Sequence, residues 1–135
     1  MAANTRFVTG VHILVILSQN DALKTSSDLA EELHTNPVVV RRILSSLQQA
    51  KLIVSHKGPS GGSKLTRPAK SISLADVHSA LESNHGPNLP KSSGVVASKV
   101  HAAIAKAYKD CHRAFEAELE QVSIAQLLKR SQKAR

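Results

Sequence analysis

The sequence has very few aromatic residues and a single cysteine. Of its 135 residues, none is tryptophan, one is tyrosine and two are phenylalanine. Proteins that bind single-stranded nucleic acid stack bases on exposed rings, so this composition argues against such a binding platform. The one cysteine, Cys111, cannot form an internal disulfide or a metal cage made only of cysteines within one chain.

Long apolar runs are also missing. Because no stretch reaches about 18 apolar residues, the sequence predicts no membrane-spanning helix. Residues 7–17 could imitate a secretion signal, but Thr9 and His12 interrupt them and no cleavage pattern of small residues follows. We interpret this segment as a buried helix. The lone thiol and the lack of an export signal predict a protein of the reducing cytoplasm.

Acidic residues are absent from the middle of the chain, although the net charge is +8. None occurs between Glu32 and Asp76, whereas this interval holds seven of the 18 basic residues. Solvated surfaces normally mix both signs of charge, so this loss of carboxylates favours a surface that faces a polyanion. Nucleic acid is the first expectation and an anionic membrane the second. An ordinary solvated face is the alternative.

The spacing of apolar residues predicts a mainly α-helical fold. We expect a mostly buried helix over 5–19, a short edge strand at 24–25, and a second helix capped by Ser26 or Ser27. Asn36 and Pro37 are typical of the cap and the first position of a third helix. Its apolar face recurs at positions 40, 43, 44 and 47. Two helices joined by a tight turn, with an outward basic face on the second, indicate a helix-turn-helix; a generic helical hairpin is the alternative.

Residues 52–66 predict a small β-hairpin after the third helix, the position of a wing. A strand over 52–57 precedes a turn over 58–63 and a return strand over 64–66. Glycines at 58, 61 and 62 would let the backbone approach a phosphate or a groove edge without Cβ clashes. A nucleotide-binding loop is disfavoured, because no Gly-Lys-Ser/Thr follows and no helix opens there.

The C-terminal half predicts a long dimerisation helix. Ser73-x-x-Asp76 is a capping box for a fourth helix, and 84–94 is a linker with two prolines and two glycines. From residue 95 to about 121, a helix of roughly 40 Å carries an apolar stripe too long for a small domain to cover, which predicts a two-fold homodimer. Ser123 caps a short last helix. The predicted dimer interface comprises Val96, Val100, Ile104, Cys111, Phe115 and Leu119.

These elements divide the chain into four units. Residues 1–83 form a winged helix-turn-helix DNA-binding domain, and 84–94 form a loop or linker. Residues 95–128 form the dimerisation helix and the short C-terminal helix, and 129–135 form a basic tail that frays. The predicted fold class is therefore mainly α with a small β-hairpin wing, extended by a long C-terminal dimerisation helix.

Five motifs follow one another through the middle of the chain: Asn36-Pro-Val-Val-Val-Arg-Arg-Ile-Leu44, Leu52-Ile-Val, Gly58-Pro-Ser-Gly-Gly62, Leu65-Thr-Arg-Pro68 and Ile72-Ser-Leu-Ala-Asp76. With them, the chain resembles the Rrf-two (Rrf2) family of bacterial winged-helix regulators over about residues 5–128. This family includes the iron–sulfur cluster regulator and the nitric-oxide-sensing repressor. The resemblance implies a dimeric transcription factor, usually a repressor, that binds a palindromic operator.

The chain departs from the cluster-binding members of that family. Those members carry three cysteines in the loop before the long helix, whereas 84–94 contains none. One cysteine is poor provision for an iron–sulfur cluster, so we predict no cofactor and no metal site. We interpret Cys111 as a packing residue, with a redox thiol as the alternative. Ser63 stands where relatives often have tyrosine or phenylalanine after the two glycines.

Together these features predict a sequence-specific regulator that binds double-stranded DNA as a dimer. The third helix would enter the major groove and the wing would lie on the backbone or in the minor groove. Two roles are equally expected for Arg41, a hydrogen bond to a base and a contact with a phosphate, whereas Arg42 is expected mainly at a phosphate. Val38 is expected either to contact a thymine methyl group or to pack inside the protein. The predicted DNA-contact set is Ser27, Asn36, Pro37, Val38, Arg41, Arg42, Ser45, Lys57, Pro59, Ser60, Gly61, Gly62, Lys64 and Arg67.

Other functional classes find less support. We predict that the chain is not an enzyme, because it has no nucleophile elbow, no nucleotide loop and no paired carboxylates in a loop-rich site. The alternative functions are a basic RNA-binding module and a protein-interaction dimer that has lost DNA binding. The sequence predicts no membrane partner and specifies no effector.

Overall fold

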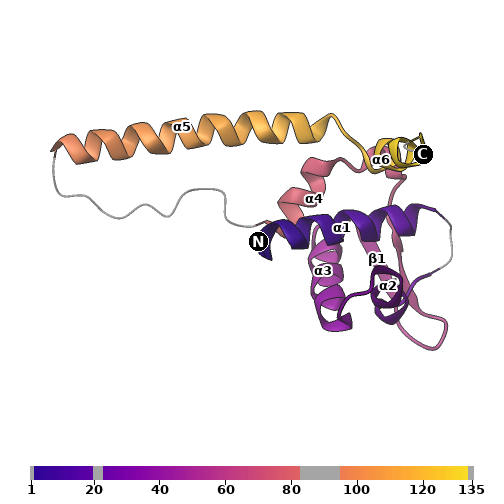
Figure 1. The fold of residues 1–135 in the computed structure, drawn as a ribbon. Helices are drawn as coiled ribbons and strands as arrows, with labels where there is room; N and C mark the ends of the chain where they lie inside the picture. Colours follow the sequence, from indigo (N-terminus) through magenta and orange to yellow (C-terminus); the bar gives the residue numbers. More distant parts are fainter. Residues whose placement is uncertain (1, 20–22, 83–94, 134–135) are drawn as a thin grey trace.

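The computed structural model describes residues 2–19, 23–82 and 95–133, and it confirms a mainly helical fold with one antiparallel hairpin (Figure 1). The predicted linker at 84–94 lies outside the described residues. The elements are α1 (Ala2–Ser18), α2 (Ser26–Leu33), α3 (Pro37–Gln49), β1 (Ile53–His56), β2 (Gly62–Leu65), the 3-10 helix η1 (Ala69–Ser71), α4 (Leu74–Leu81), α5 (Val95–Glu120) and α6 (Ile124–Lys133).

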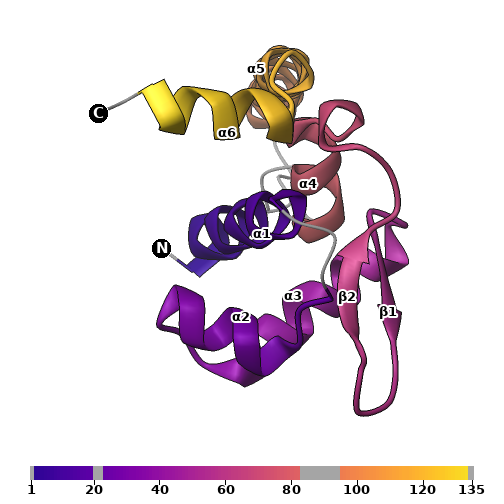
Figure 2. The same cartoon turned by 90° about the vertical axis from the view of Figure 1, so that its right-hand side faces the viewer.

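The hydrophobic core is built around α1. This helix lies between α6 on one side and the α2–α3 pair on the other, and it also contacts α4 (Figure 2). Burial of a large aliphatic side chain stabilises a fold by about 1.5–3 kcal/mol. The buried side chains named next therefore hold together the winged unit, by which we mean α1 to α4 with the hairpin. The fully buried large side chains are Ile13, Leu14, Leu29, Val40, Ile43, Leu47, Leu52, Ile53, Ile72, Val77 and Ile124.

Local capping sets the helix-turn-helix. The cap of α2 is Thr25, not Ser26 or Ser27 as predicted, because Thr25 forms a capping box with Asp28. In it the Thr25 N–H donates to the Asp28 carboxylate and the Asp28 N–H donates to the Thr25 hydroxyl, each at 3.0 Å. These hydrogen bonds, the backbone N–H of Thr25 first, lower the pKa of Asp28. His34 ends α2 in the left-handed conformation. The Asn36 side chain then accepts a hydrogen bond from the Val38 N–H at 2.8 Å, which confirms the predicted start of α3.

The hairpin pairs Ile53 with Leu65 and His56 with Gly62. The return strand starts at Gly62, two residues earlier than predicted, because Ser63 is buried and pairs with Lys24. Lys24 and Ser63 exchange two backbone hydrogen bonds, so the predicted edge strand at 24–25 is reduced to one bridge. The hydroxyl groups of Ser63 and Ser55 lie 3.0 Å apart across the hairpin.

We expect Gly62→Ala to destabilise the protein more than Gly58→Ala. Both glycines have positive φ, 145° and 107°, a conformation that costs other residues about 1–3 kcal/mol. A Cβ on Gly62 would also lie 2.8 Å from the backbone of Lys24, whereas a Cβ on Gly58 meets nothing within 4 Å. Chemical denaturation measures the two free energies of unfolding. Equal losses would show that the approach to Lys24 places no steric demand on position 62.

The helix α5 leaves the winged unit and is anchored to it at its C-terminal end (Figure 1). A backbone bridge joins Ser73 and Ser123, so α6 returns against η1 and α1. Ser123 caps α6 through reciprocal hydrogen bonds with Gln126, as the sequence predicts in assigning the cap to Ser123. The predicted frayed tail from residue 129 is wrong up to Lys133, because α6 continues to that residue.

Candidate nucleic-acid interface

The outward face of α3 is basic and exposed. Val40, Ile43 and Leu47 point into the core, whereas Arg41 and Arg42 are exposed on the other side of the helix. Val38 is 44% exposed, so it does not pack internally. Ser45 continues this face towards the C-terminal half of the helix. The arrangement follows from the 3.6-residue period of the apolar positions, which turns most of the intervening side chains to solvent.

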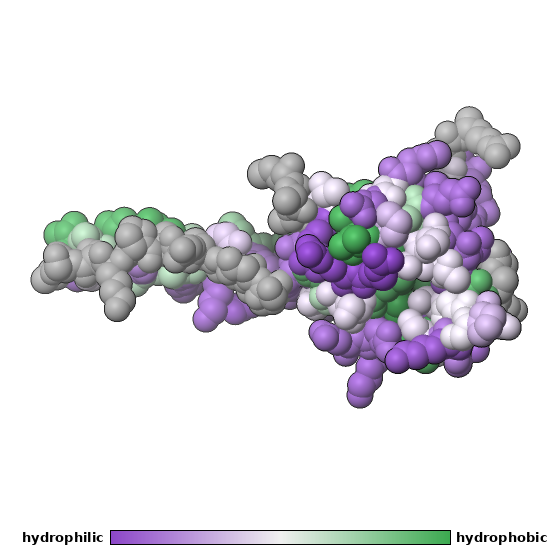
Figure 3. Space-filling view, turned by 90° about the horizontal axis from the view of Figure 1, so that it is seen from below, coloured by the Kyte–Doolittle hydropathy of each residue, from purple (hydrophilic) through white to green (hydrophobic). Residues whose placement is uncertain are grey.

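Three segments meet at the end of the molecule that carries this face. The start of α3, the helix α2 and the tip of the hairpin all lie at the lower end in Figure 1. Viewed from that end, the surface shows a small apolar patch surrounded by strongly hydrophilic side chains (Figure 3). Ser27, Asn36 and Pro37 are exposed and line one shallow cavity between α2 and α3. The predicted helix-turn-helix contacts therefore share one surface.

The wing presents two lysines on its flanks. Lys57 and Lys64 are exposed, as are Pro59 and Ser60 in the turn. The structure adds a packing reason for two of the three wing glycines. A Cβ on Gly61 would overlap the carbonyl of His56, and Gly62 is held against Lys24, so both are required by packing within the protein. Only Gly58 faces open space.

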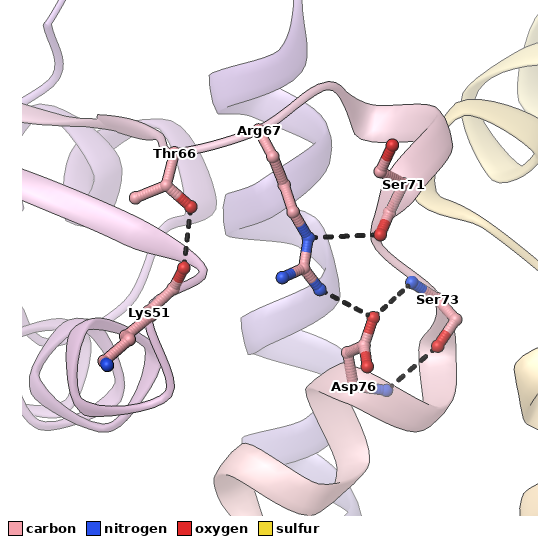
Figure 4. A network of polar contacts seen from close by, with 6 residues as sticks. All are labelled: Lys51, Thr66, Arg67, Ser71, Ser73 and Asp76. Atoms are coloured by element: carbon pink, nitrogen blue, oxygen red, sulfur yellow. Dashed lines mark hydrogen bonds and ion pairs between the residues drawn. The ribbon is translucent and has the colours of Figure 1, made fainter.

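The guanidinium group of Arg67 is exposed but already bonds to other residues of the same chain (Figure 4). Its Nε donates to the carbonyl of Ser71 at 3.1 Å, and its Nη2 donates to Asp76 at 3.0 Å. The same Asp76 oxygen accepts from the Ser73 N–H, so Arg67 ties the end of the hairpin to the start of α4. The sequence predicts Arg67 as a DNA contact because it follows the wing. The structure gives it the structural role of holding Asp76, whose position nine residues away no local pattern indicated.

Arg6 is a residue that the sequence argument missed. Its Nη2 lies 3.4 Å from the Oγ of Ser46, on the exposed side of α3 near Arg42. Arg6 and Ser46 are 40 residues apart in the chain. No short-range pattern could indicate this neighbourhood, which arises because α1 packs across α3.

The helix α5 exposes its apolar stripe. Val96 is 76% exposed and Phe115 is 50% exposed, with Val100, Ile104 and Tyr108 between them. Figure 3 shows hydrophobic side chains along one edge of the projecting helix. Cys111 is exposed on this helix, whereas Leu119 is partly buried near the winged unit. Tyr108 is an apolar member of this helix that the predicted interface omitted.

The stripe is joined to the winged unit through ring contacts at its C-terminal half. The Phe115 ring lies 5.3 Å from the His78 ring of α4, which in turn lies 5.7 Å from the Phe7 ring of α1. Tyr108 stacks on His112 at 6.2 Å, and His112 pairs with Glu116 at 3.2 Å. The ring contacts of Phe115, His78 and Phe7 therefore hold the C-terminal half of α5 against α4 and α1.

Comparison with known proteins identifies the family. The family model for Rrf2, described as iron-dependent transcriptional regulators, matches residues 3–130. This chain belongs to the Rrf2 family. YwnA of Bacillus subtilis (strain 168), named as an HTH-type transcriptional regulator, is 35% identical to this Rrf2 protein over 135 residues, covering 93% of this chain and 96% of YwnA.

Solved structures agree with this assignment. A crystal structure described as that of a DNA-binding protein matches with a TM-score of 0.79 at 29% identity, covering 91% of this chain and 98% of the other. IscR from T. potens shares the fold with a TM-score of 0.71 at 22% identity, covering 97% of this chain and 88% of IscR. This Rrf2 protein is thus a winged-helix, DNA-binding transcriptional regulator.

The residues of this Rrf2 protein do not fit a cysteine-ligated iron–sulfur cluster. Such clusters need several thiolates, and the chain has only Cys111. Within the described ranges, no group of three or more histidine, cysteine, aspartate or glutamate side chains is arranged to hold a metal ion. None of the described helices combines the length and apolar character that a membrane crossing requires.

Proposed function

We propose that this Rrf2 protein binds a palindromic operator as a homodimer and represses transcription there. The observation that carries the proposal is the exposed, acid-free face of α3, which includes Val38, Arg41 and Arg42. The start of this helix lies at the same end of the molecule as the tip of the wing (Figure 1). A major groove about 12 Å wide accepts one α-helix. The phosphates at the edges of the groove attract basic side chains. When these side chains bind, the counterions condensed on the DNA are released, and the affinity therefore depends steeply on the salt concentration.

Each part of this face has a distinct role in the proposal. Arg41 reads a base, because its planar fork fits the two acceptors of guanine, and Val38 contacts a thymine methyl. Arg42 and Ser45 contact the phosphate backbone beside the groove. A phosphate binds at the exposed N-terminus of α3, since helix N-termini favour anions. Asn36 and Pro37 form this end of the helix, and Ser27 of α2 lies nearby.

The wing follows the backbone or enters the minor groove in this proposal. Lys57 and Lys64 supply the charge, and Pro59, Ser60, Gly61 and Gly62 shape the tip between them. We leave Arg67 out of the contact set, because its guanidinium group already holds Asp76 and the Ser71 carbonyl.

The exposed stripe on α5 pairs the two copies. An apolar row of this length in water is unfavourable, and a second α5 packed against it removes both rows from solvent. A two-fold axis through this seam presents two α3 helices to DNA in opposite directions. The operator is then palindromic, with half-site centres about one helical turn apart or a multiple of it.

In this proposal, the Rrf2 protein acts by binding DNA without catalysing a reaction, and it acts in the cytoplasm, where bacterial DNA resides. Its single cysteine leaves it without a cluster, so any signal reaches it by another route.

We expect selection from a random 30-base-pair duplex library to enrich one palindromic sequence. The enriched duplex should bind about 10³-fold or more tightly than a scrambled duplex at physiological salt, as specific regulators do. Sequencing of bound DNA and a salt titration of both duplexes measure this. Binding without enrichment, or preferential retention of a looped RNA over both duplexes, would contradict the proposal in favour of a basic RNA-binding module.

A further inference from the structure

A cavity of about 600 Å³ lies between the start of α1 and the exposed side of α3. Its lining combines two arginines, Arg6 and Arg42, with the hydroxyl groups of Ser45 and Ser46 and an apolar floor that includes Ile43. No carboxylate lines it among the described residues. The cavity therefore exposes more apolar than polar surface, carries positive charge from its two arginines, and is open to solvent.

The charge arrangement in this cavity favours an anion. Arg67 has Asp76 as its partner, but neither Arg6 nor Arg42 forms a salt bridge within the described part of the chain. Like charges that line one cavity repel each other, and a bound anion reverses this interaction. The hydrogen bond from Arg6 to Ser46 holds the first guanidinium group on the wall of α3.

The position of the cavity indicates which anion it receives. It lies on α3, the helix proposed to enter the major groove, and at the end of α1 near which the chain begins (Figure 1). This is also the side towards which α5 projects. In the proposed homodimer this side would face the second copy and the centre of the operator. A DNA strand that borders the groove on this side would pass the cavity.

We propose that Arg6 and Arg42 form a clamp for one backbone phosphate of the DNA strand on the dimer-axis side of α3. This inference rests on the proposed function and adds α1 to the DNA-binding surface. Arginine suits the role because its fork donates two parallel hydrogen bonds to a phosphate. The clamp contributes affinity and register but reads no base.

Arg6→Gln tests the clamp in the full-length protein. The probes are the duplex enriched by selection and a scrambled duplex of equal length. Each phosphate contact contributes about 0.9 to the slope of log affinity against log salt, so loss of two Arg6 side chains should make the slope shallower by about 2. The affinity ratio between the two duplexes should stay the same.

Two further variants isolate the cause. Arg130→Gln removes the same charge from an exposed position on α6, on the opposite side of α1 from α3, and should leave the slope unchanged (Figure 2). Arg6→Lys keeps the charge and should retain most of the slope. Thermal melting of each variant should match that of the wild type, because Arg6 is exposed.

The outcomes separate the two proposals. A wild-type protein that shows neither sequence preference nor salt dependence contradicts the proposed function itself. A wild type with both properties, accompanied by an Arg6→Gln variant with the wild-type slope, contradicts the clamp alone. An equal loss of slope in Arg6→Gln and Arg130→Gln would also overturn the clamp, since net charge would then explain both.

Discussion

Replacing Ile104 with aspartate is expected to make the protein monomeric and to weaken its binding to the enriched duplex by about 10²-fold or more. Ile104 lies in the middle of the exposed stripe, with Val100 one turn before it and Tyr108 one turn after it. In a two-fold seam the substitution buries two carboxylates without partners, and each costs several kcal/mol. A monomer also loses the gain of about 10²–10⁴ that comes from linking two half-site contacts.

Ala102→Asp is the matched control for this variant. Ala102 is exposed and lies on the opposite side of α5 from Ile104, at about 100° per residue. That side carries the basic residues Lys106 and Arg113. Sedimentation equilibrium should show a dimer for the wild type and for Ala102→Asp but a monomer for Ile104→Asp. A dimeric Ile104→Asp protein would remove the stripe from the interface and require another pairing surface.

Replacing Arg41 with alanine is expected to lower the preference for the enriched duplex over the scrambled duplex by about 10²-fold or more. A good bidentate arginine–guanine pair contributes about 1–3 kcal/mol of discrimination, and the dimer makes this contact twice. Arg41 is exposed and has no role in the core, so folding and dimerisation should be unaffected. Competition titrations with the two duplexes measure the preference.

Gln48→Ala provides the control on the same helix. Gln48 is exposed near the C-terminal end of α3, farther along the helix from the proposed base contacts. Its loss should leave the preference intact. If Arg41→Ala instead keeps the preference and only reduces the salt slope, Arg41 contacts a phosphate and the base reader must be sought among Val38, Ser45 and Arg42.

Elements specified by near neighbours could be predicted from the sequence. The start of α3 depends on Asn36 and Pro37, and the start of α4 depends on the Ser73 and Asp76 box, so each signal lies within four residues. The length of α5 follows from 26 residues without glycine or proline. Where two local caps competed, as at Thr25 against Ser26, the sequence predicted the helix but not its cap.

Tertiary packing decided the roles of residues whose partners are distant in the chain. Gly62 is required by Lys24, and Arg6 reaches Ser46, because folding brings strands and helices from separate segments together. Arg67 shows the same limit over a shorter span, since the direction of its side chain depends on how the hairpin meets α4. Charge, periodicity and caps thus determined that the chain forms a basic winged helix followed by a long helix with an apolar stripe, because these properties are local. The ion pair of Arg67 with Asp76 and the position of Arg6 against α3 were decided only by the folded arrangement, because they depend on contacts that no local pattern specifies.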